Sequence, residues 1–247
     1  MSERSKDFKD FPVAAESKAL VPHSHPPAVN PAPMALFAFG LTTALLQVKH
    51  TTLGNKDVDY YVFGFAAFFG GLLQVIGGLA EAKRNNIFGY TGFLVYGGFW
   101  MSWGASLFFI KLVGLPVSTQ AVQAMLSLMG IFTFVMFVCS LVLNMTLSVL
   151  MWLLMMTFFL LAAGVKHETV DIVGGWFGML TAATAYWLAS AELLNASFGR
   201  DVVPLGKWKL FAAAEEASKS EPRLTRSVSK VQPVETEPQP VDDRYTV

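Results

Sequence analysis

Residues 30–41 have the sequence NPAPMALFAFGL, in which a polar stretch containing two prolines changes abruptly into an apolar run. Proline fixes φ near the helical value and has no N–H group, so a helix tolerates it only in the first turn. The pattern therefore predicts that a helix begins here, with Asn30 as its N-cap and with Pro31 and Pro33 in its first turn.

The same helix start is a candidate site for a small anion. Because the two prolines provide no donor, the free N–H groups at this end of the helix are those of Ala32 and Met34. They lie at the positive end of the helix dipole, where a carboxylate can bind. The alternative is a rigid helix start that binds nothing, and the residues alone leave both interpretations open.

The composition indicates an α-helical protein that spans a membrane several times. Of the 247 residues, 53% are hydrophobic and only 15% are charged. Lys111 is the only charged residue between about 87 and 165, and this length is sufficient for several spans of about 20 residues. The formal net charge of zero leaves no basic face for phosphate groups, so we expect no nucleic-acid partner.

Six apolar segments, each bounded by charged or turn residues, are predicted to cross the bilayer, at about 33–48, 60–80, 87–110, 121–142, 146–165 and 172–195. The connections are too short to hold a second domain. We therefore expect an all-α membrane protein with a six-helix transmembrane domain over 30–206, preceded by a disordered tail over 1–29 and followed by one over 207–247.

The topology predicts which side of the membrane holds the two tails. An even number of spans places both of them on the same side. A small excess of Lys and Arg in the loops of that side favours the cytoplasm. We therefore expect a multi-pass protein of the cell membrane with both termini cytoplasmic.

Polar side chains within the spans are the candidates for a transport path, because they are costly in hydrocarbon and normally face other helices or water. Gln74 and Glu81 lie seven residues apart on one face of the second span, and Asn195 lies at the end of the sixth. We predict that these three bind substrate. For Glu81 the alternative is an interfacial ion pair with the basic residues that follow it.

Glu192 lies about one turn before the predicted end of the sixth span. A carboxyl group at such a depth can take up and release a proton, so Glu192 is the candidate for proton coupling. The alternative is a structural role for a buried carboxyl group. No nucleophile, base and orienting group come together in the sequence, and no set of metal ligands is present, so we expect neither an enzyme nor a bound metal or cofactor.

Four blocks of the sequence resemble one family: NPAPMAL at 30–36, FGGLLQ at 69–74, the run from NIFG at 86–89 to YGGFW at 96–100, and ELLN at 192–195 through FGR at 198–200 with PLG at 204–206. The chain is similar, in the same motif order, to the acetate uptake transporters. This family of acetate/succinate–proton symporters includes bacterial acetate permeases and fungal acetate and ammonia-export proteins. The chain departs from the family in one place: the family motif is usually NPAPLGL, and here Met34 and Ala35 replace its leucine and glycine.

The resemblance implies a ring of six-helix protomers, expected to be a hexamer, in which each protomer carries its own path for acetate and related small monocarboxylates, with succinate as a further candidate and protons as partners. From the chemistry of the helix start, we predict that Asn30, Pro31, Ala32, Pro33 and Met34 form a site or vestibule for the carboxylate.

The resemblance further implies an aromatic and aliphatic constriction in the path. Following the motifs, its aromatic members fall on Phe39 and Tyr96. The aliphatic partner is expected at Leu154, although the fifth span carries no motif, and a small neighbour in the sixth span at Ala185. The alternative is that these are ordinary core residues. Two other functions stay open: a pore for a neutral molecule such as ammonia, and a membrane sensor that signals through a tail with phosphorylation sites between 223 and 230.

Overall fold

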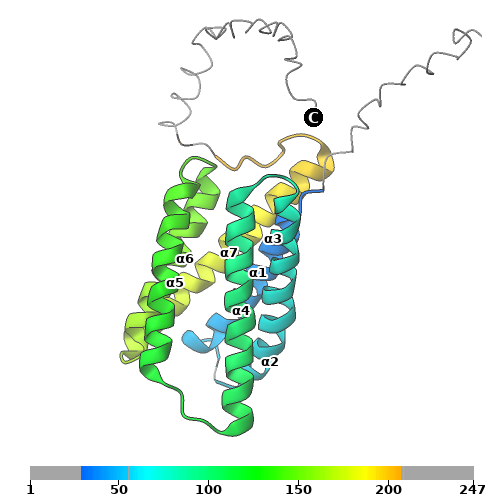
Figure 1. Cartoon of the computed structure of the whole chain (residues 1–247). Coiled ribbons are helices and arrows are strands. Elements are labelled where there is room, and N and C mark those ends of the chain that lie inside the picture. Colours follow the sequence, from blue (N-terminus) through cyan, green and yellow to red (C-terminus); the bar gives the residue numbers. More distant parts are fainter. Residues whose placement is uncertain (1–28, 55, 207, 209–247) are drawn as a thin grey trace, which may run out of the picture. The chain divides into compact units, whose positions relative to one another are not determined.

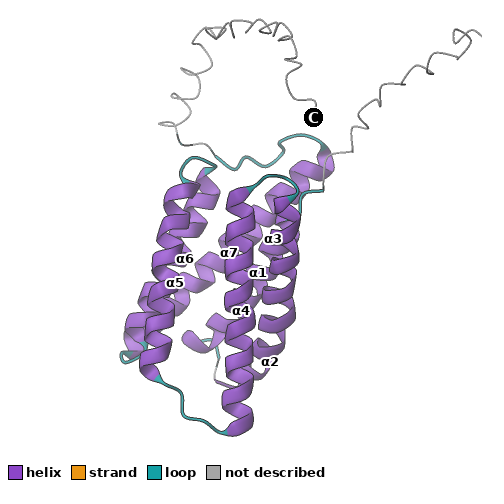
Figure 2. Cartoon of the chain, in the orientation of Figure 1, coloured by secondary structure: helices purple, strands orange, loops and turns teal. Residues whose placement is uncertain are grey.

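In the computed structural model, residues 29–54, 56–206 and 208 are described. These residues form a bundle of helices without a strand (Figures 1 and 2). Six helical stretches are long and apolar enough to cross a membrane, at Ala32–His50, Asp59–Ala82, Ile87–Val113, Thr119–Ser140, Met145–Gly164 and Glu168–Phe198. The prediction of an all-α membrane protein with six spans is therefore confirmed. The two predicted tails lie, apart from Val29 and Trp208, outside the described residues.

The first span consists of α1 (Ala32–Gln47) and the 3₁₀ turn η1 (Val48–His50). The second span follows the short η2 (Lys56–Val58) and is built from α2 (Asp59–Gly64), the π-helical segment η3 (Phe65–Leu73) and α3 (Gln74–Ala82). The remaining spans are α4 (Ile87–Val113), α5 (Thr119–Ser140), α6 (Met145–Gly164) and α7 (Glu168–Phe198).

Three of the spans begin with a side-chain cap that the sequence supplies locally. The side chains of Asn86, Ser118 and Asn144 each accept a hydrogen bond from the backbone N–H three residues further on, at α4, α5 and α6. Such a cap satisfies one of the N–H groups that have no partner within a helix. Gly114 and Gly199 end α4 and α7 in the left-handed conformation that glycine adopts readily.

The start of α1 differs from the prediction by one residue. Pro31 is the N-cap, and the first backbone bond joins the N–H of Ala35 to the carbonyl of Pro31 at 3.2 Å. Asn30 still caps the end, since its Oδ1 accepts the N–H of Ala32 at 3.1 Å. Pro31 already has helical dihedral angles, which makes it the N-cap. The side chain of Asn30 still reaches the backbone N–H of Ala32, two residues further along the chain. At the last span, α7 begins at Glu168 rather than near 172, so Asp171 belongs to the helix.

The first helix is the central element of the bundle. It packs on α7 along one side and on η3 and α3 along the other (Figure 1). On the outer sides, α4 covers η3 and α3, while α6 packs on α7 and α5 packs on α6. Direct contact between α4 and α5 is slight, so side chains and cavities fill the space that these two helices enclose with α1, α6 and α7.

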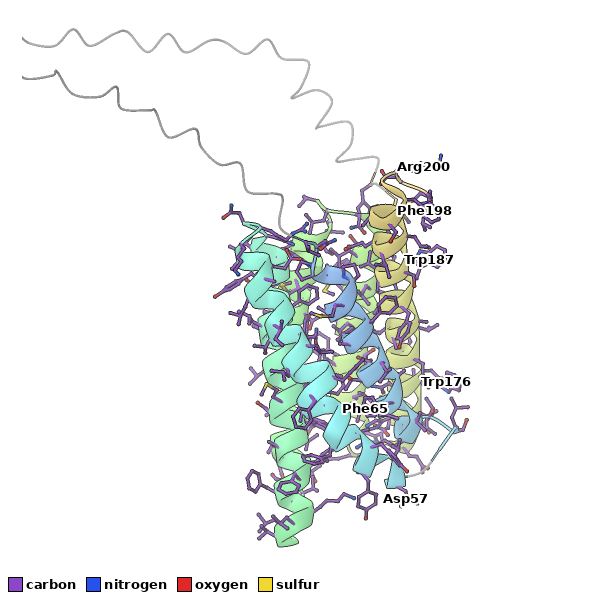
Figure 3. The ribbon with its side chains drawn as sticks, turned by 90° about the vertical axis from the view of Figure 1, so that its right-hand side faces the viewer. Asp57, Phe65, Trp176, Trp187, Phe198 and Arg200 are labelled. Atoms are coloured by element: carbon purple, nitrogen blue, oxygen red, sulfur yellow. The ribbon has the colours of Figure 1, made fainter. Side chains whose placement is uncertain are left out.

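Large apolar side chains cover the outside of the bundle, as a bilayer requires. On α7, Trp176, Trp187 and Phe198 project away from the other helices (Figure 3), with 44%, 57% and 63% of their surfaces exposed. A water-soluble monomer rarely exposes so many large apolar groups together. The structure and the composition thus agree on a multi-pass membrane protein.

Adjacent glycines of α4 test how closely the helices approach. A Cβ atom at Gly97 would lie 2.9 Å from Val75 Cγ2 and 3.0 Å from the carbonyl oxygen of Gly71, whereas one at Gly98 would meet nothing within 4 Å. We expect Gly97→Ala to lower the free energy of unfolding by about 1–3 kcal/mol through overpacking. The matched variant Gly98→Ala should be neutral or more stable, because alanine favours a helix by about 1 kcal/mol over glycine. Thermal denaturation of both variants in detergent measures the difference, and equal midpoints would contradict this account of the packing.

Candidate functional site

Two cavities enter the described part of the bundle from opposite ends. Cavity 1, of about 330 Å³, is lined at the end of the bundle where α1 and α4 begin and α7 ends. Its polar side chains are Gln74, Glu81, Asn86, Asn144 and Glu192. Cavity 2, of about 950 Å³, is lined at the other end, where α1 and α6 finish and α7 begins. Together they could form a path along the axis of the bundle.

A thin wall of apolar side chains separates the two cavities. Phe39 of α1, Tyr96 of α4 and Leu154 of α6 line both of them. The exposed fraction of each is 4% or less, and the ring centroids of Phe39 and Tyr96 lie 6.0 Å apart. Because these residues come from three different helices and face both cavities, we call them the barrier. They are three of the four residues assigned to the constriction from the sequence.

The fourth residue assigned to the constriction occupies a neighbouring place. Ala185 of α7 is completely buried and belongs to the same apolar core as the barrier, but it lines neither cavity. Tyr96 contributes its ring to the barrier, and its hydroxyl donates a hydrogen bond to Oγ1 of Thr133 on α5 at 3.1 Å. The phenol hydroxyl therefore has its polar partner within the protein.

The opening motif joins two helices rather than leaving its donors free. Asn30 Nδ2 donates to Glu192 Oε2 at 3.0 Å, and Asn30 Oδ1 accepts from the N–H of Ala32. Of the five residues of this motif, Ala32 alone lines cavity 1. The N–H of Ala32 is already bonded, contrary to the expectation that it is available to an anion. The asparagine oxygen accepts from this N–H because an Asn side chain readily reaches the backbone two residues further along the chain.

The two acidic residues predicted in the spans both line cavity 1. Glu81 is 1% exposed; its Oε2 accepts from Asn86 Nδ2 at 3.1 Å and lies 3.3 Å from Nε of Arg84, so it forms the expected ion pair while facing the cavity. Glu81 Oε1 has no hydrogen-bond partner among the described residues. Gln74, also 1% exposed, lines the same cavity with its Oε1 unpartnered in the described part of the chain.

Asn195 lies outside both cavities. Its Oδ1 accepts from the backbone N–H groups of Val202 and Val203 at 2.8 Å each, and its Nδ2 donates to the carbonyl of Val203 at 2.9 Å. The side chain therefore fastens the loop that follows α7. The structure gives it a place away from the predicted substrate-binding residues Gln74 and Glu81.

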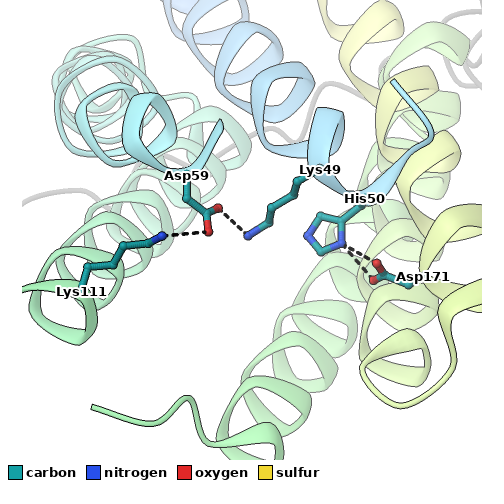
Figure 4. A network of polar contacts seen from close by, with 5 residues as sticks. All are labelled: Lys49, His50, Asp59, Lys111 and Asp171. Carbon is teal, nitrogen blue, oxygen red and sulfur yellow. Dashed lines mark hydrogen bonds and ion pairs between the residues drawn. The ribbon is translucent and has the colours of Figure 1, made fainter. Parts of the chain in front are cut away.

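A charged network at cavity 2 was not predicted from the sequence (Figure 4). Lys49 Nζ lies 2.8 Å from Asp59 Oδ1, and Lys111 Nζ lies 3.9 Å from Asp59 Oδ2. His50 Nδ1 lies 2.9 Å from both carboxylate oxygens of Asp171. These five residues come from η1, α2, α4 and α7, so only folding brings them together. In the sequence, only their positions near the ends of spans indicated that these residues could meet.

The two cavities differ in charge. Cavity 1 has two carboxylates in its lining, Glu81 and Glu192, and no lysine or histidine. Cavity 2 is lined by basic and acidic side chains together, namely Lys49, His50, Asp59, Lys166, His167, Glu168 and Asp171. Within the described residues no three of the possible metal-ligating His, Cys, Asp and Glu side chains form a group that could hold a metal ion.

Comparison with known proteins agrees with this architecture. Residues 13–205 match the model of the GPR1/FUN34/yaaH family. The chain belongs to this family. The predicted resemblance to the acetate transporters is thereby confirmed.

Named relatives of this GPR1/FUN34/yaaH protein include the succinate-acetate/proton symporter SatP of Escherichia coli (strain K12), which is 38% identical over 72% of this chain and 95% of the relative. Acetate permease A of Emericella nidulans is 33% identical over 71% of this chain and 65% of its own length. Ammonia transport outward protein 2 of Saccharomyces cerevisiae is 32% identical over 77% of this chain and 72% of the relative. These names describe transport proteins, which agrees with the expectation that the chain is not an enzyme.

A solved structure shares the fold. The structure of the bacterial acetate channel SatP superposes with a TM-score of 0.68, at 37% identity, and covers 72% of this chain and 99% of that one.

The bond between Asn30 and Glu192 can be tested by two substitutions at residue 30. Asn30→Ala removes the donor to Glu192 and the acceptor for the N–H of Ala32, and should lower the free energy of unfolding by about 1–3 kcal/mol. Asn30→Asp keeps an acceptor for the N–H but places a carboxylate against a carboxylate, so it should restore little of the stability. Thermal midpoints in detergent provide the measurement. If both variants unfold at the wild-type temperature, the junction contributes nothing.

Proposed function

We propose that the protein carries acetate and related small monocarboxylates across a membrane, through a path within each protomer that consists of cavity 1, the barrier and cavity 2. The observation that carries the proposal is the barrier itself, since Phe39, Tyr96 and Leu154 line two cavities that enter from opposite ends. The family relatives named as acetate and succinate transporters support the choice of substrate.

The barrier accounts for selection by size. Apolar walls pass a compact molecule that sheds little water and stop one that is longer or more hydrated. No Arg or Lys lies in the barrier, so nothing there holds an anion tightly. Acetate has one carboxyl group and one methyl group, and it is small enough to pass such a wall while its carboxyl group meets polar side chains on both sides.

We infer proton coupling from the charges that line cavity 1. Glu81 is paired with Arg84, so Glu192 is the carboxylate that repels an anionic substrate there, while a neutral acid meets no such repulsion. We infer that the acid crosses in its neutral form, and that Glu192, held by Asn30, takes part in the proton exchange. The amide oxygen of Gln74, unpartnered in the described residues, is placed to accept a hydrogen bond from a neutral carboxyl group.

We further propose a homohexamer with both termini in the cytoplasm. The exposed apolar faces of α4, α5 and α7 offer surfaces for neighbouring protomers as well as for lipid. The first and last parts of the bundle lie at the same end, since Asn30 bonds Glu192 and Met145 N–H bonds the carbonyl of Gly206. This arrangement agrees with tails on one side of the membrane.

A pore for a neutral molecule such as ammonia is the second candidate. An apolar barrier also passes a small uncharged solute, and one relative is named as an ammonia transport protein. Purified protein in liposomes separates the two functions. Uptake of labelled acetate that exceeds that of empty liposomes and rises with an inward proton gradient would support the first proposal; ammonia flux without acetate flux would replace it with the second.

Shortening a barrier residue should admit larger acids. We expect Leu154→Ala, and less strongly Phe39→Ala, to raise the flux of lactate relative to acetate, because each opens the wall shared by the two cavities. Loss of a buried leucine costs about 2–5 kcal/mol, so expression is measured in parallel. Leu153→Ala is the matched control, since Leu153 is buried on the same helix but lines neither cavity. If expression holds and the lactate to acetate ratio is unchanged in both Leu154→Ala and Phe39→Ala, or rises equally in Leu153→Ala, the constriction lies elsewhere.

Glu192→Gln tests the proton role of this carboxyl group. The amide keeps the shape and can still bond Asn30, but it gains and loses no charge. Acetate uptake by this variant should depend on pH less steeply than wild-type uptake does. Glu81→Gln serves for comparison, because Glu81 lines the same cavity and is paired with Arg84. A wild-type pH profile for Glu192→Gln would assign this residue a structural role.

A further inference from the structure

We propose that His50, held by Asp171, is the proton-exchange residue of cavity 2, which protonates the carboxylate before it meets the barrier. This inference rests on the proposed transport of small carboxylates and assigns a further residue to that path. Both side chains line cavity 2. Neither belongs to the motifs on which the resemblance to the acetate transporters depends.

The geometry fixes which nitrogen of His50 exchanges the proton. Nδ1 lies 2.9 Å from both Oδ1 and Oδ2 of Asp171. An ionised carboxylate can only accept hydrogen bonds, so Nδ1 carries the hydrogen. The ring then has Nε2 available for a proton from solution, as in a histidine that a carboxylate orients for general acid–base chemistry. Figure 4 shows the second nitrogen on the edge of the ring that faces away from Asp171.

The environment lets the pair meet both water and substrate. The side chains of His50 and Asp171 are 20% and 29% exposed, so water reaches them, while the cavity extends from them to the barrier. The backbone is held firmly, because Gly175 of α7 lies so close to His50 that a Cβ atom there would overlap the carbonyl of His50. The imidazole is therefore positioned by two contacts with α7, one from its side chain and one from its backbone.

The other charged groups around cavity 2 are less suited to this exchange. Lys49 of η1 is paired with Asp59 of α2, and Lys111 of α4 lies near the other oxygen of the same carboxylate. Both lysines are therefore held in ion pairs that carry a net charge of +1. Lys166 and Glu168 flank the start of α7 and are exposed. Histidine is the side chain whose charge changes between about pH 5 and 8, and His50 and His167 are the two that line the cavity.

His50 and His167 differ in one decisive respect. His50 has a carboxylate partner, while His167 is exposed and has no carboxylate partner among the described residues. A carboxylate that bonds one ring nitrogen fixes the tautomer and the orientation of the ring for proton transfer. The structure therefore favours His50 as the exchanging residue and supplies His167 as its matched control.

The step balances without any further reactant. A proton from the water of cavity 2 binds Nε2 of neutral His50, and the imidazolium remains paired with Asp171. The imidazolium then transfers this proton to a carboxylate oxygen of the entering acid. The products are a neutral acid and a neutral imidazole, ready for the next proton. The neutral acid enters the apolar barrier without the cost of placing a charge there.

Acetate uptake into proteoliposomes, measured across about pH 5–8, tests the proposal on the full-length protein. His50→Gln removes the titrating ring, so the ratio of uptake at acidic to neutral pH should fall severalfold. His167→Gln should retain the wild-type profile. Asp171→Asn removes the carboxylate that orients the imidazole, so its pH profile should shift away from that of the wild type, and it serves as a second variant if His50→Gln does not fold.

Three results would overturn the assignment while the transport function stands: a wild-type pH profile for His50→Gln, an equal change in His50→Gln and His167→Gln, or an unshifted profile for Asp171→Asn. A uniform loss of rate at every pH in the His50 and Asp171 variants would show that the pair is only a structural clamp. Failure of the wild-type protein to move labelled acetate would instead defeat the proposed function, and this inference with it.

Discussion

The packing of α1 against α7 is the constraint on which the rest of the structure depends. Helices in a bilayer approach closely only where side chains are small. Gly178 and Gly175 of α7 lie against Gln47 and His50, so that a Cβ atom at either glycine would overlap the first helix. Side chains then close both ends of this contact, Asn30 with Glu192 at one end and His50 with Asp171 at the other. The barrier residue Phe39 is thereby fixed between two anchored ends.

The position of the barrier follows from this central helix. Since α1 is enclosed by α7 on one side and by η3 and α3 on the other, the face of α1 that carries Phe39 points to the space between α4 and α6. Tyr96 and Leu154 enter that space from α4 and α6. The π-helical turn before Gln74 belongs to the same region, and such turns are frequent at functional sites. Close packing at the centre and open cavities at both ends are thus parts of one arrangement.

The two cavities differ in the charges that line them, which would give the proposed path a direction. Cavity 1 presents two carboxylates and amide groups, whereas cavity 2 combines lysines and histidines with acidic partners. An anion is attracted to basic groups and repelled by unpaired acidic ones, and both effects strengthen where water is scarce. A carboxylate therefore meets different electrostatic environments before and after the barrier. Groups that exchange protons at each end would allow the same molecule to be charged in solution and neutral in the wall.

The sequence by itself determined the fold class, because long apolar segments without charge have few alternatives in water or lipid. It also pointed to Phe39 and Tyr96 through family motifs, although the span of Leu154 carries no motif, and it marked Glu81 and Glu192 as acids within spans. The sequence also determines contacts between residues that are close along the chain, such as the side-chain caps of α4, α5 and α6.

Only the tertiary structure decided which polar groups face a cavity. Asn195 and Asn30 are similar amides near span ends, yet one fastens a loop and the other joins Glu192 across 162 residues of sequence. His50 and Asp171 are separated by 121 positions, and no local pattern predicts their bond. The reason is that helical periodicity fixes the face of a residue on its own helix, while the partner opposite that face depends on how the helices pack.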